Sequence, residues 1–196
     1  MIRFFDIIFS FFGMIILIPF FIVIYIFVCL ESRGGGLYHQ TRVGLNGRLF
    51  QLYKFRTMRV GSDVKGLITV GGRDPRITRM GYYLRKYKID ELPQLWNVLI
   101  GDMSLVGPRP EVQKYVNMYT EEQRKVLSVR PGITDYASIE YVDENEILSK
   151  AEDPDKAYIE QIMPDKIRYN MKYINHRCVS EYFKIIFITI KKIIRK

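Results

Sequence analysis

The sequence predicts an α+β fold that is mainly helical, with a membrane segment at its N-terminus. Residues 7–30 form a run of 24 residues without a charge, which is long enough to cross a bilayer as a helix. Two segments rich in aromatic and branched residues, 37–41 and 49–57, flank a Gly-Leu-Asn-Gly turn and predict a short β-hairpin. Much of the remaining chain has apolar residues at helical spacing. We therefore expect a membrane segment over residues 1–33 and a cytosolic globular domain over residues 34–196 that lies on the membrane surface.

The apolar run is expected to form a kinked helix that re-enters the membrane. Its 24 residues reach about 36 Å as an α-helix. Pro19 lies near the middle, where it removes a backbone hydrogen bond and bends the helix. Arg3 precedes the run and a basic block follows it from Arg33, so both ends are expected on the cytoplasmic side. No small-residue cleavage site follows, which disfavours a signal peptide. A single membrane span is the alternative, because proline is tolerated in true spans.

Basic residues are concentrated in the first part of the globular domain. The chain has 196 residues, with 30 Lys and Arg against 21 Asp and Glu, and a net charge of +9. Residues 33–88 hold 13 basic and 2 acidic side chains, whereas residues 89–170 hold 9 basic and 16 acidic ones. In the second strand of the hairpin, Lys54 and Arg56 share one face and could contact phosphate or lipid headgroups. The pattern favours an anionic partner, such as nucleic acid, phospholipid or a phosphorylated substrate, over an ordinary solvated surface.

The cysteines and histidines do not suggest a metal centre or a disulfide framework. Cys29 and Cys178 lie far apart in the sequence and are expected to be reduced. His39 and His176 have no cysteine or carboxylate at ligand spacing, which disfavours a zinc site.

The segment 84–110 is the most informative part of the chain. Asp90 and Glu91 directly precede an apolar set at the spacing of one helix face, so Asp90 is expected to be the N-cap of a helix. Pro93 fits the first turn of that helix, where its missing N–H costs little. The N–H groups of that turn would favour an anion beside Asp90. A capped amphipathic helix packed on a core is the plain alternative.

Several arginines surround this segment in the sequence. Arg76 and Arg85 lie just upstream, Arg109 lies between two prolines that restrict its backbone, and Arg130 lies in a turn of sequence RPGIT. Planar guanidinium groups commonly hold phosphate oxygens, although surface arginines also simply neutralise carboxylates. These four residues, together with Arg56, are the candidate substrate-binding side chains.

The other segments carry weaker predictions. Residues 62–73 are expected to form a glycine-rich loop and residues 111–128 a charged helix. The acidic region 135–165 is assigned no chemistry, because a run of charges is more often a solvated face. Residues 169–196 are expected to form a basic amphipathic helix at the membrane interface, with a core-packed terminal helix as the alternative.

Five motifs in this order make the chain resemble the small monotopic phosphoglycosyl transferases, also called the bacterial sugar transferase family. They cover roughly residues 3–134. The motifs are Arg3-x-x-Asp6; Gln40-x-Arg42-x-Gly44 leading to YKFRTM at 53–58; DPRIT at 74–78; Leu84-Arg85 leading to DELPQL at 90–95; and GDMSLVGPRP at 101–110. The DELPQL and SLVGPRP motifs are the most specific of these.

The resemblance implies transfer of a phospho-sugar from a UDP-sugar to polyprenyl phosphate, such as undecaprenyl phosphate, on the cytoplasmic face of a bacterial inner membrane. Asp90 matches the family's nucleophile, which forms a covalent phospho-sugar intermediate, and Glu91 is the second member of the dyad. Mg²⁺ is the implied cofactor, with Asp90 as its protein ligand. Arg85 and Arg109 match phosphate-binding positions, and Arg130 is a weaker candidate for the nucleotide. The reaction would begin the assembly of a surface glycan or glycoconjugate.

The chain departs from the family pattern at two places. Ile18 precedes the kinking proline where many relatives have serine, which weakens the expectation of re-entrance. Residues 135–138 are Asp-Tyr-Ala-Ser where many relatives have Gly-x-Ala-Gln, and we take this as a sign of a different sugar preference. Two other classes of function are less consistent with the sequence. A membrane-tethered nucleic-acid binder would explain only the charge, so no nucleic-acid partner is expected, and a non-catalytic scaffold would not explain the Asp-Glu pair.

Overall fold

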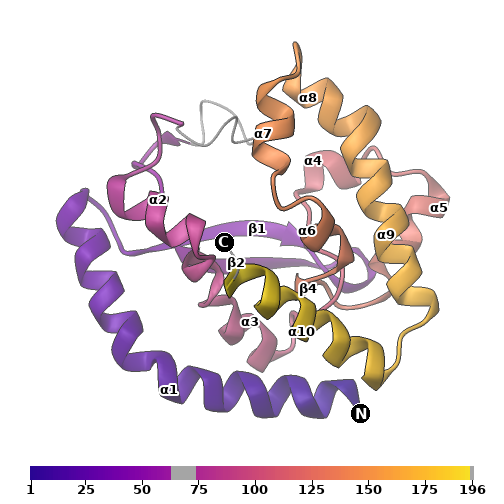
Figure 1. Cartoon of the computed structure of the whole chain (residues 1–196), viewed down its shortest axis with the longest axis horizontal. Helices are drawn as coiled ribbons and strands as arrows, with labels where there is room; N and C mark the ends of the chain where they lie inside the picture. Colours follow the sequence, from indigo (N-terminus) through magenta and orange to yellow (C-terminus); the bar gives the residue numbers. More distant parts are fainter. Residues whose placement is uncertain (63–73, 195–196) are drawn as a thin grey trace.

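The computed structural model describes residues 1–62 and 74–194, and it confirms a mainly helical α+β fold (Figure 1). The predicted loop over 62–73 lies, from residue 63 on, outside the described residues. The α-helices are α1 (Ile2–Glu31), α2 (Arg79–Lys86), α3 (Gln94–Ile100), α4 (Gln113–Val116), α5 (Glu121–Arg124), α6 (Tyr136–Glu140), α7 (Glu144–Ser149), α8 (Pro154–Ala157), α9 (Met163–Asn175) and α10 (Val179–Ile194). The strands are β1 (Leu37–Val43), β2 (Leu49–Phe55), β3 (Ser104–Val106) and β4 (Gly132–Thr134).

The predicted hairpin is confirmed. Strands β1 and β2 pair antiparallel, from Leu37 opposite Phe55 to Val43 opposite Leu49. In the connecting turn Asn46 has φ 53° and Gly47 has φ 81°, a left-handed conformation that asparagine and glycine adopt at little cost.

A second pair of strands was not predicted. Strands β3 and β4 are parallel, with Ser104 opposite Gly132, and β4 lies in the RPGIT segment that was expected to form only a turn. Gly107 and Gly132 allow the close approach here, because a Cβ on Gly132 would lie 2.1 Å from the backbone nitrogen of Gly107. The pair joins the segment that ends at Arg109 to the segment that follows Arg130.

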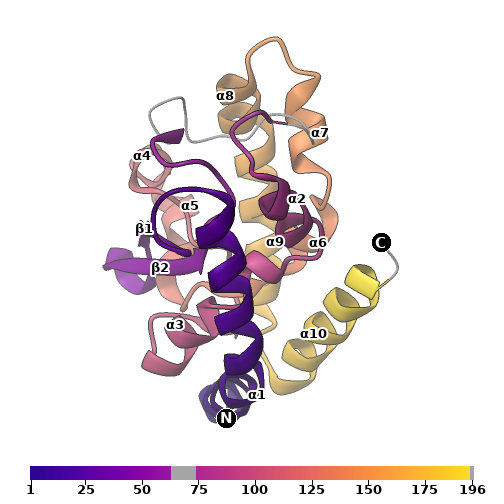
Figure 2. The ribbon, with the colours of Figure 1, turned by 90° about the vertical axis from the view of Figure 1, so that its left-hand side faces the viewer.

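Helix α1 is continuous over 30 residues, contains Pro19 and bends partway along its length (Figure 1). The proline supplies the cause, since it removes one backbone hydrogen bond and its ring crowds the preceding turn. The first half of α1 passes beneath α3 and α10, and the second half rises beside α2 (Figures 1 and 2). The bend therefore lets one helix contact two sides of the globular domain.

The N-terminal end of α1 is fastened to the domain by Arg3 and Asp6. The Arg3 guanidinium donates to the carbonyls of Val98 at 2.5 Å and Leu99 at 3.0 Å, which lie at the C-terminal end of α3. Asp6 is 2% exposed, and its Oδ1 accepts three hydrogen bonds. The donors are Ser104 Oγ at 3.0 Å, the Leu105 N–H at 2.9 Å and Tyr182 Oη at 2.9 Å. A carboxylate in a buried position needs such partners to offset its lost hydration.

The C-terminal end of α1 is fastened to the same domain. The Glu31 carboxylate accepts from the N–H groups of Arg79 at 2.6 Å and Met80 at 2.9 Å, which belong to the first turn of α2. The Arg56 guanidinium donates to backbone carbonyls around the end of α1: Ser32 at 2.8 Å, Gly34 at 3.3 Å, Val28 at 3.4 Å and Arg33. Arg56 therefore satisfies carbonyls that a helix end leaves unpaired.

The C-terminal segment differs from the prediction of one amphipathic helix over 169–196. The structure divides it at 176–178 into the end of α9 and α10. Helix α10 buries Tyr182 and Ile185 in the core but leaves Phe187, at 68% exposure, and Ile190, at 51%, on the surface. It is both core-packed along one edge and apolar along another, because the amphipathic face is wider than its contact with the domain.

Apolar side chains remain exposed along most of α1. In the described part of the chain, α1 is the one helix that is long and apolar enough to cross a membrane. Its exposed residues include Phe4, Phe11, Phe12, Ile15, Ile16, Phe20, Ile22, Val23, Ile26, Phe27 and Leu30. So large an apolar surface is typical of contact with lipid, which indicates association with a membrane.

Candidate active site

The Asp90–Glu91 pair lies in a tight turn between α2 and α3. Lys88 enters the turn in a left-handed conformation, with φ 58°, and Ile89–Glu91 form one turn of 3-10 helix. The prediction that Asp90 caps the next helix is wrong. Helix α3 begins at Gln94 with Pro93 at the cap position, and no side chain caps it. Hydrogen bonds of the i→i+3 type carry the chain through this turn, so Asp90 stands about one turn before α3.

The Asp90 carboxyl is buried and poorly solvated. Its residue is 6% exposed, and Oδ1 has no hydrogen-bond partner within the described residues. Burial, and next the charge of Glu91, raise the pKa of Asp90 to about 6. The positive charges of Lys54, Arg85 and Lys88 act in the opposite direction and favour the carboxylate. At neutral pH Asp90 is therefore mostly ionised, with an oxygen that no described protein group occupies.

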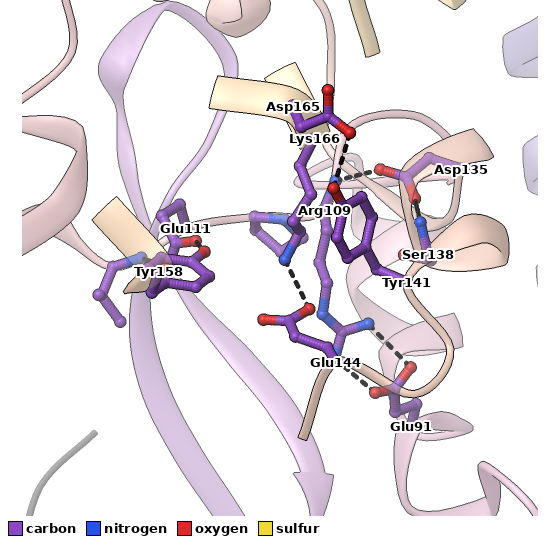
Figure 3. Close-up of polar contacts among 12 residues, drawn as sticks. Glu91, Arg109, Glu111, Asp135, Ser138, Tyr141, Glu144, Tyr158, Asp165 and Lys166 are labelled. Atoms are coloured by element: carbon purple, nitrogen blue, oxygen red, sulfur yellow. Dashed lines mark hydrogen bonds and ion pairs between the residues drawn. The ribbon is translucent and has the colours of Figure 1, made fainter. Parts of the chain in front are cut away.

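Glu91 differs from Asp90 because Arg109 holds it firmly (Figure 3). The guanidinium donates to both carboxylate oxygens, at 3.1 Å and 2.5 Å, in the two-pronged geometry typical of strong arginine–carboxylate pairs. Burial alone would raise the pKa of Glu91, but the charge and hydrogen bonds of Arg109, together with Lys88, lower it to about 2. In turn, the charge of Glu91 raises the pKa of Arg109. Glu91 is therefore ionised and fixed by Arg109, whereas its neighbour Asp90 keeps one carboxylate oxygen without a hydrogen-bond partner among the described residues.

The position of Arg109 depends on Asp135, a residue that is not among the site residues expected from the sequence. Asp135 is fully buried, and its Oδ2 accepts from the backbone N–H of Arg109 at 3.0 Å. Its Oδ1 accepts from the N–H of Ser138 at 2.6 Å and so caps α6 (Figure 3). Residues 135–138, where the chain departs from the pattern of many relatives, thus include a helix cap that also holds the turn of Arg109. An aspartate three residues before Ser138 was the available signal.

Beside Arg109 lies an ion pair from the acidic region that was assigned no chemistry. Glu144 accepts from Lys166 at 3.0 Å, and both side chains stand next to the Arg109 side chain in Figure 3. The charge of Glu144 also helps to raise the pKa of Arg109. The acidic region therefore forms one wall beside the Asp-Glu pair.

Arg85 reaches the site from α2. Its Nε donates to Thr57 Oγ1 at 2.9 Å. Burial lowers the pKa of Arg85, and the charge of Asp90 has the largest opposing effect. Gly81 makes this possible, because a Cβ there would lie 2.1 Å from the backbone oxygen of Thr57. The absence of a side chain at Gly81 thus lets α2 lie directly on the end of the hairpin.

Lys54 is a cation of the site that was recognised on the strand but not selected. It lies on β2, with its ammonium 5.0 Å from the centroid of the Tyr38 ring. Burial and the neighbouring charge of Arg42 lower its pKa to about 8, while Asp90 raises it. Its alternation with Phe55 along the strand was the signal, since that pattern puts it opposite the core.

The other candidate arginines have different surroundings. Arg76 forms an ion pair with Asp74 at 2.6 Å, and its charge acts on Arg85. Arg130 donates through Nε to the carbonyl of Gly101 at 2.8 Å, so it holds the loop after α3. The expectation that Arg56 binds substrate needs correction. Its guanidinium is bound to the carbonyls at the end of α1 and does not join the Asp-Glu pair. The structure thus brings Arg85 and Arg109 to the pair, with Lys54 beside them.

The chain is similar to several known sugar-phosphate and sugar transferases. The chain is 37% identical over 172 residues to UDP-N-acetylgalactosamine-undecaprenyl-phosphate N-acetylgalactosaminephosphotransferase from Aeromonas hydrophila, covering 86% of this chain and 38% of that protein. It is 34% identical over 191 residues to UDP-glucose:undecaprenyl-phosphate glucose-1-phosphate transferase from Klebsiella pneumoniae, covering 95% and 38%. A Streptococcus agalactiae protein named galactosyl transferase CpsE is 36% identical over 175 residues, covering 84% and 36%.

The chain thus spans little more than a third of the length of each of these three relatives. The sequence model of the family described as bacterial sugar transferase matches residues 1–196, which is the whole chain. This match includes both ends of α1, the turn with the Asp-Glu pair and the arginine turn of Arg109. The chain therefore belongs to the bacterial sugar transferase family.

Proposed function

We propose that this protein transfers a phospho-sugar from a UDP-sugar to polyprenyl phosphate. The single observation that carries the proposal is the asymmetry of the Asp-Glu pair: Glu91 is bound by Arg109, whereas the buried Asp90 has an unpartnered oxygen among cations. The named substrates of the Aeromonas and Klebsiella relatives, a UDP-sugar and undecaprenyl phosphate, support this reaction class. We expect the transferred sugar to be one of those that the relatives use.

The proposed reaction has two steps with one nucleophile. An Asp90 carboxylate oxygen attacks the sugar-linked phosphorus of the UDP-sugar, and the bond between this phosphorus and the bridging oxygen breaks. UMP leaves with that oxygen and its electron pair, and an aspartyl phospho-sugar remains. An oxygen of the lipid phosphate then attacks the same phosphorus, releasing the Asp90 carboxylate and forming a polyprenyl-diphosphate-linked sugar. No proton has to be removed from the nucleophile, since Asp90 is mostly ionised at neutral pH.

The cations of the site have separate tasks in this scheme. Arg85 and Lys54 offset the repulsion between an anionic nucleophile and an anionic diphosphate. Arg109 is bound to Glu91 by two hydrogen bonds, and its side chain is still 39% exposed, so it can contact a phosphate oxygen as well. Arg76 and Arg130 are proposed to act further out, toward the nucleotide. Glu91 orients Arg109 rather than acting as a second nucleophile.

The site fits Mg²⁺ as a cofactor. The described residues contain no cluster of three or more His, Cys, Asp or Glu able to hold a metal by itself. Mg²⁺ commonly binds one or two carboxylates together with substrate phosphates, and the unpartnered Asp90 oxygen is suited to that arrangement. When bound, the ion would neutralise charge on the diphosphate. Asp90 is the residue that would hold it.

The way α1 is fastened supports a re-entrant topology on the cytoplasmic face of the inner membrane. Arg3 and Asp6 bind one end of the helix to the globular domain, and Glu31 binds the other end to the same domain. A helix whose two ends contact one folded domain has both ends on that domain's side of the bilayer. The bend at Pro19 turns its exposed apolar middle toward the lipid.

One assay tests the proposed reaction. Detergent-solubilised protein is incubated with UDP-N-acetylgalactosamine, UDP-glucose or UDP-galactose, together with undecaprenyl phosphate and Mg²⁺, and UMP release is measured. We expect release with at least one sugar and a loss of at least a thousandfold in Asp90→Asn. Glu121→Gln, which removes an exposed carboxylate on α5, is the control and keeps full activity. If none of the sugars yields UMP, or if Asp90→Asn is fully active, the reaction is not the one proposed.

The topology is tested by cysteine labelling. The two native cysteines are replaced by serine, and single cysteines are introduced at Ile2 and at Arg33, which is exposed. We expect a membrane-impermeant maleimide added to intact cells to leave both unlabelled, and to label both after the inner membrane is opened. Labelling of one end in intact cells would demonstrate a single span.

A further inference from the structure

An open apolar groove lies between the C-terminal part of α1 and the N-terminal part of α2. Its volume is about 270 Å³, and it is lined by Phe27, Glu31, Arg79, Met80 and Tyr83. Phe27 and Tyr83 are each 53% exposed, so both aromatic rings offer surface without a partner in the described structure. The groove contains none of the residues of the Asp-Glu pair and is a feature separate from it.

The end of the groove at Glu31 is closed to anions. A helix N-terminus usually attracts a phosphate, because its first N–H groups are unpaired. At α2 the Glu31 carboxylate already accepts from two of these groups, at 2.6 Å and 2.9 Å. A ligand with an anionic head would therefore place its head away from Glu31 and its apolar part in the groove.

The opposite end of α2 leads to the cations of the active site. Met80, Tyr83 and Tyr87 follow one another at spacings of three and four residues, so they share one side of the helix. This side extends about 10 Å along the axis and ends at Lys88, which immediately precedes the turn of Asp90. An apolar track thus runs from the groove to the positive charges that act on Asp90.

The groove is also continuous with the lipid-facing surface of α1. Phe20, Val23 and Leu30, on the same half of α1 as Phe27, are each at least 51% exposed. A long apolar chain dissolved in the bilayer can therefore enter the groove without crossing water, which keeps the hydrophobic cost of entry small. Apolar walls at one end and cations at the other match a lipid phosphate in both position and charge.

We infer that this groove, together with the adjoining side of α2, seats the first isoprene units of the polyprenyl phosphate acceptor. The inference rests on the proposed function and adds a binding site for the second substrate. The phosphate lies at the Lys88 end, within reach of the phospho-sugar on Asp90, and the chain passes over Tyr87 and Tyr83 and leaves along Phe27 into the membrane.

The two half-reactions give a test that separates this site from the chemistry. Without lipid, the first step releases one UMP per enzyme as a burst, and only the second step requires the acceptor. We expect Phe27→Ala and Tyr83→Ala to keep the wild-type burst and the KM for the UDP-sugar. Each should raise the KM for undecaprenyl phosphate about tenfold, equivalent to about 1.4 kcal/mol.

The matched controls are Phe12→Ala and Tyr82→Ala, exposed aromatic residues of the same two helices that do not line the groove. Their KM for undecaprenyl phosphate should stay within about twofold of the wild type, well below the effect expected in the groove. If groove and control variants behave alike, the inference is overturned, even when the burst proves the covalent step. A wild type without any burst would instead refute the proposed function.

Photoaffinity labelling gives a readout that does not depend on turnover. The wild-type protein is irradiated with a farnesyl phosphate analogue that carries a benzophenone at the end of the chain, and the labelled peptides are sequenced. We expect label on the peptides that contain Phe27 or Tyr83, and competition by undecaprenyl phosphate. Label confined to α10, or label that undecaprenyl phosphate does not displace, overturns the inference.

Discussion

Replacing Asp90 with asparagine should abolish activity and yet stabilise the fold. Burial and Glu91 raise the pKa of Asp90 from 3.8 to about 6, so its ionised form is less favourable in the folded protein than in the unfolded chain. Because the folded carboxyl binds its proton more tightly, wild-type stability falls as the pH rises from about 4 to about 6. Above that range the cost is about 3 kcal/mol. Asparagine carries no charge, so the variant does not have this cost in its free energy of folding.

The assay is thermal unfolding of wild type and Asp90→Asn in the same detergent from pH 4 to pH 8. For a chain of this size, about 3 kcal/mol corresponds to a rise in Tm of about 6 to 12 °C at pH 8. The difference should shrink below about pH 6 and become small at about pH 4, where the folded carboxyl is protonated and the unfolded one, with a pKa of 3.8, is about half ionised. The control Glu121→Gln removes one exposed negative charge from α5. A Tm difference that does not change with pH, or a less stable Asp90→Asn at pH 8, would refute the reasoning.

Three further substitutions test the parts that support the site. Glu91→Gln removes a charge that raises the pKa of Asp90, so the acidic limb of the kcat/KM profile should move below about pH 6 while kcat falls. Asp6→Ala leaves three buried donors unpaired, so the free energy of unfolding measured with denaturant should fall by about 3 kcal/mol or more. Gly81→Ala puts a Cβ 2.1 Å from the Thr57 oxygen and should lower UMP release more than tenfold, by about 1.4 kcal/mol or more, as α2 shifts.

Each of these has a comparison that could contradict it. An acidic limb of Glu91→Gln that stays at the wild-type pH would show that Glu91 does not set the proton affinity of its neighbour. Asp6→Asn keeps an acceptor oxygen and should lose less stability than Asp6→Ala, so equal losses would argue against the hydrogen bonds. Gly35→Ala has its nearest neighbours at 3.9 Å and should remain active, so equal activity in Gly81→Ala would show that α2 tolerates the added methyl.

Features encoded by local sequence were predicted well. The apolar run with its central proline gave the bent helix, and the Asn-Gly turn between branched segments gave the hairpin. Both depend on backbone preferences that act over a few residues. The segment that contains Asp90 could also be selected from the sequence, because a pair of acids before an apolar helical pattern is visible without any knowledge of tertiary contacts; its catalytic role stays a prediction.

Features that depend on distant contacts were missed. Strands β3 and β4 have three residues each, too few for a periodic pattern, and they pair across 28 positions of the sequence. The guanidinium of Arg56 is of a type that commonly binds phosphate, but it donates its hydrogen bonds to carbonyls at the end of α1. Asp90 was expected at a helix cap because the start of α3 was placed about one turn too early. In each case the structure depends on a partner that is distant in the sequence, or on the exact start of a short element. Local propensity predicts neither of these.

The hydrogen bonds of Asp6 make the apolar helix more than an attachment to the bilayer. A chain shortened to begin at residue 34 would expose the surface of α3 that Leu95 shares with Gly13, and would leave the hydroxyls of Ser104 and Tyr182 without their acceptor. It would also remove Arg3 from the carbonyls at the end of α3, the helix that follows the Asp90 turn. Truncation to improve solubility would thus remove contacts from the interior of the protein. Extraction with a detergent that covers α1 keeps those contacts, and with them the fold of the domain that contains Asp90.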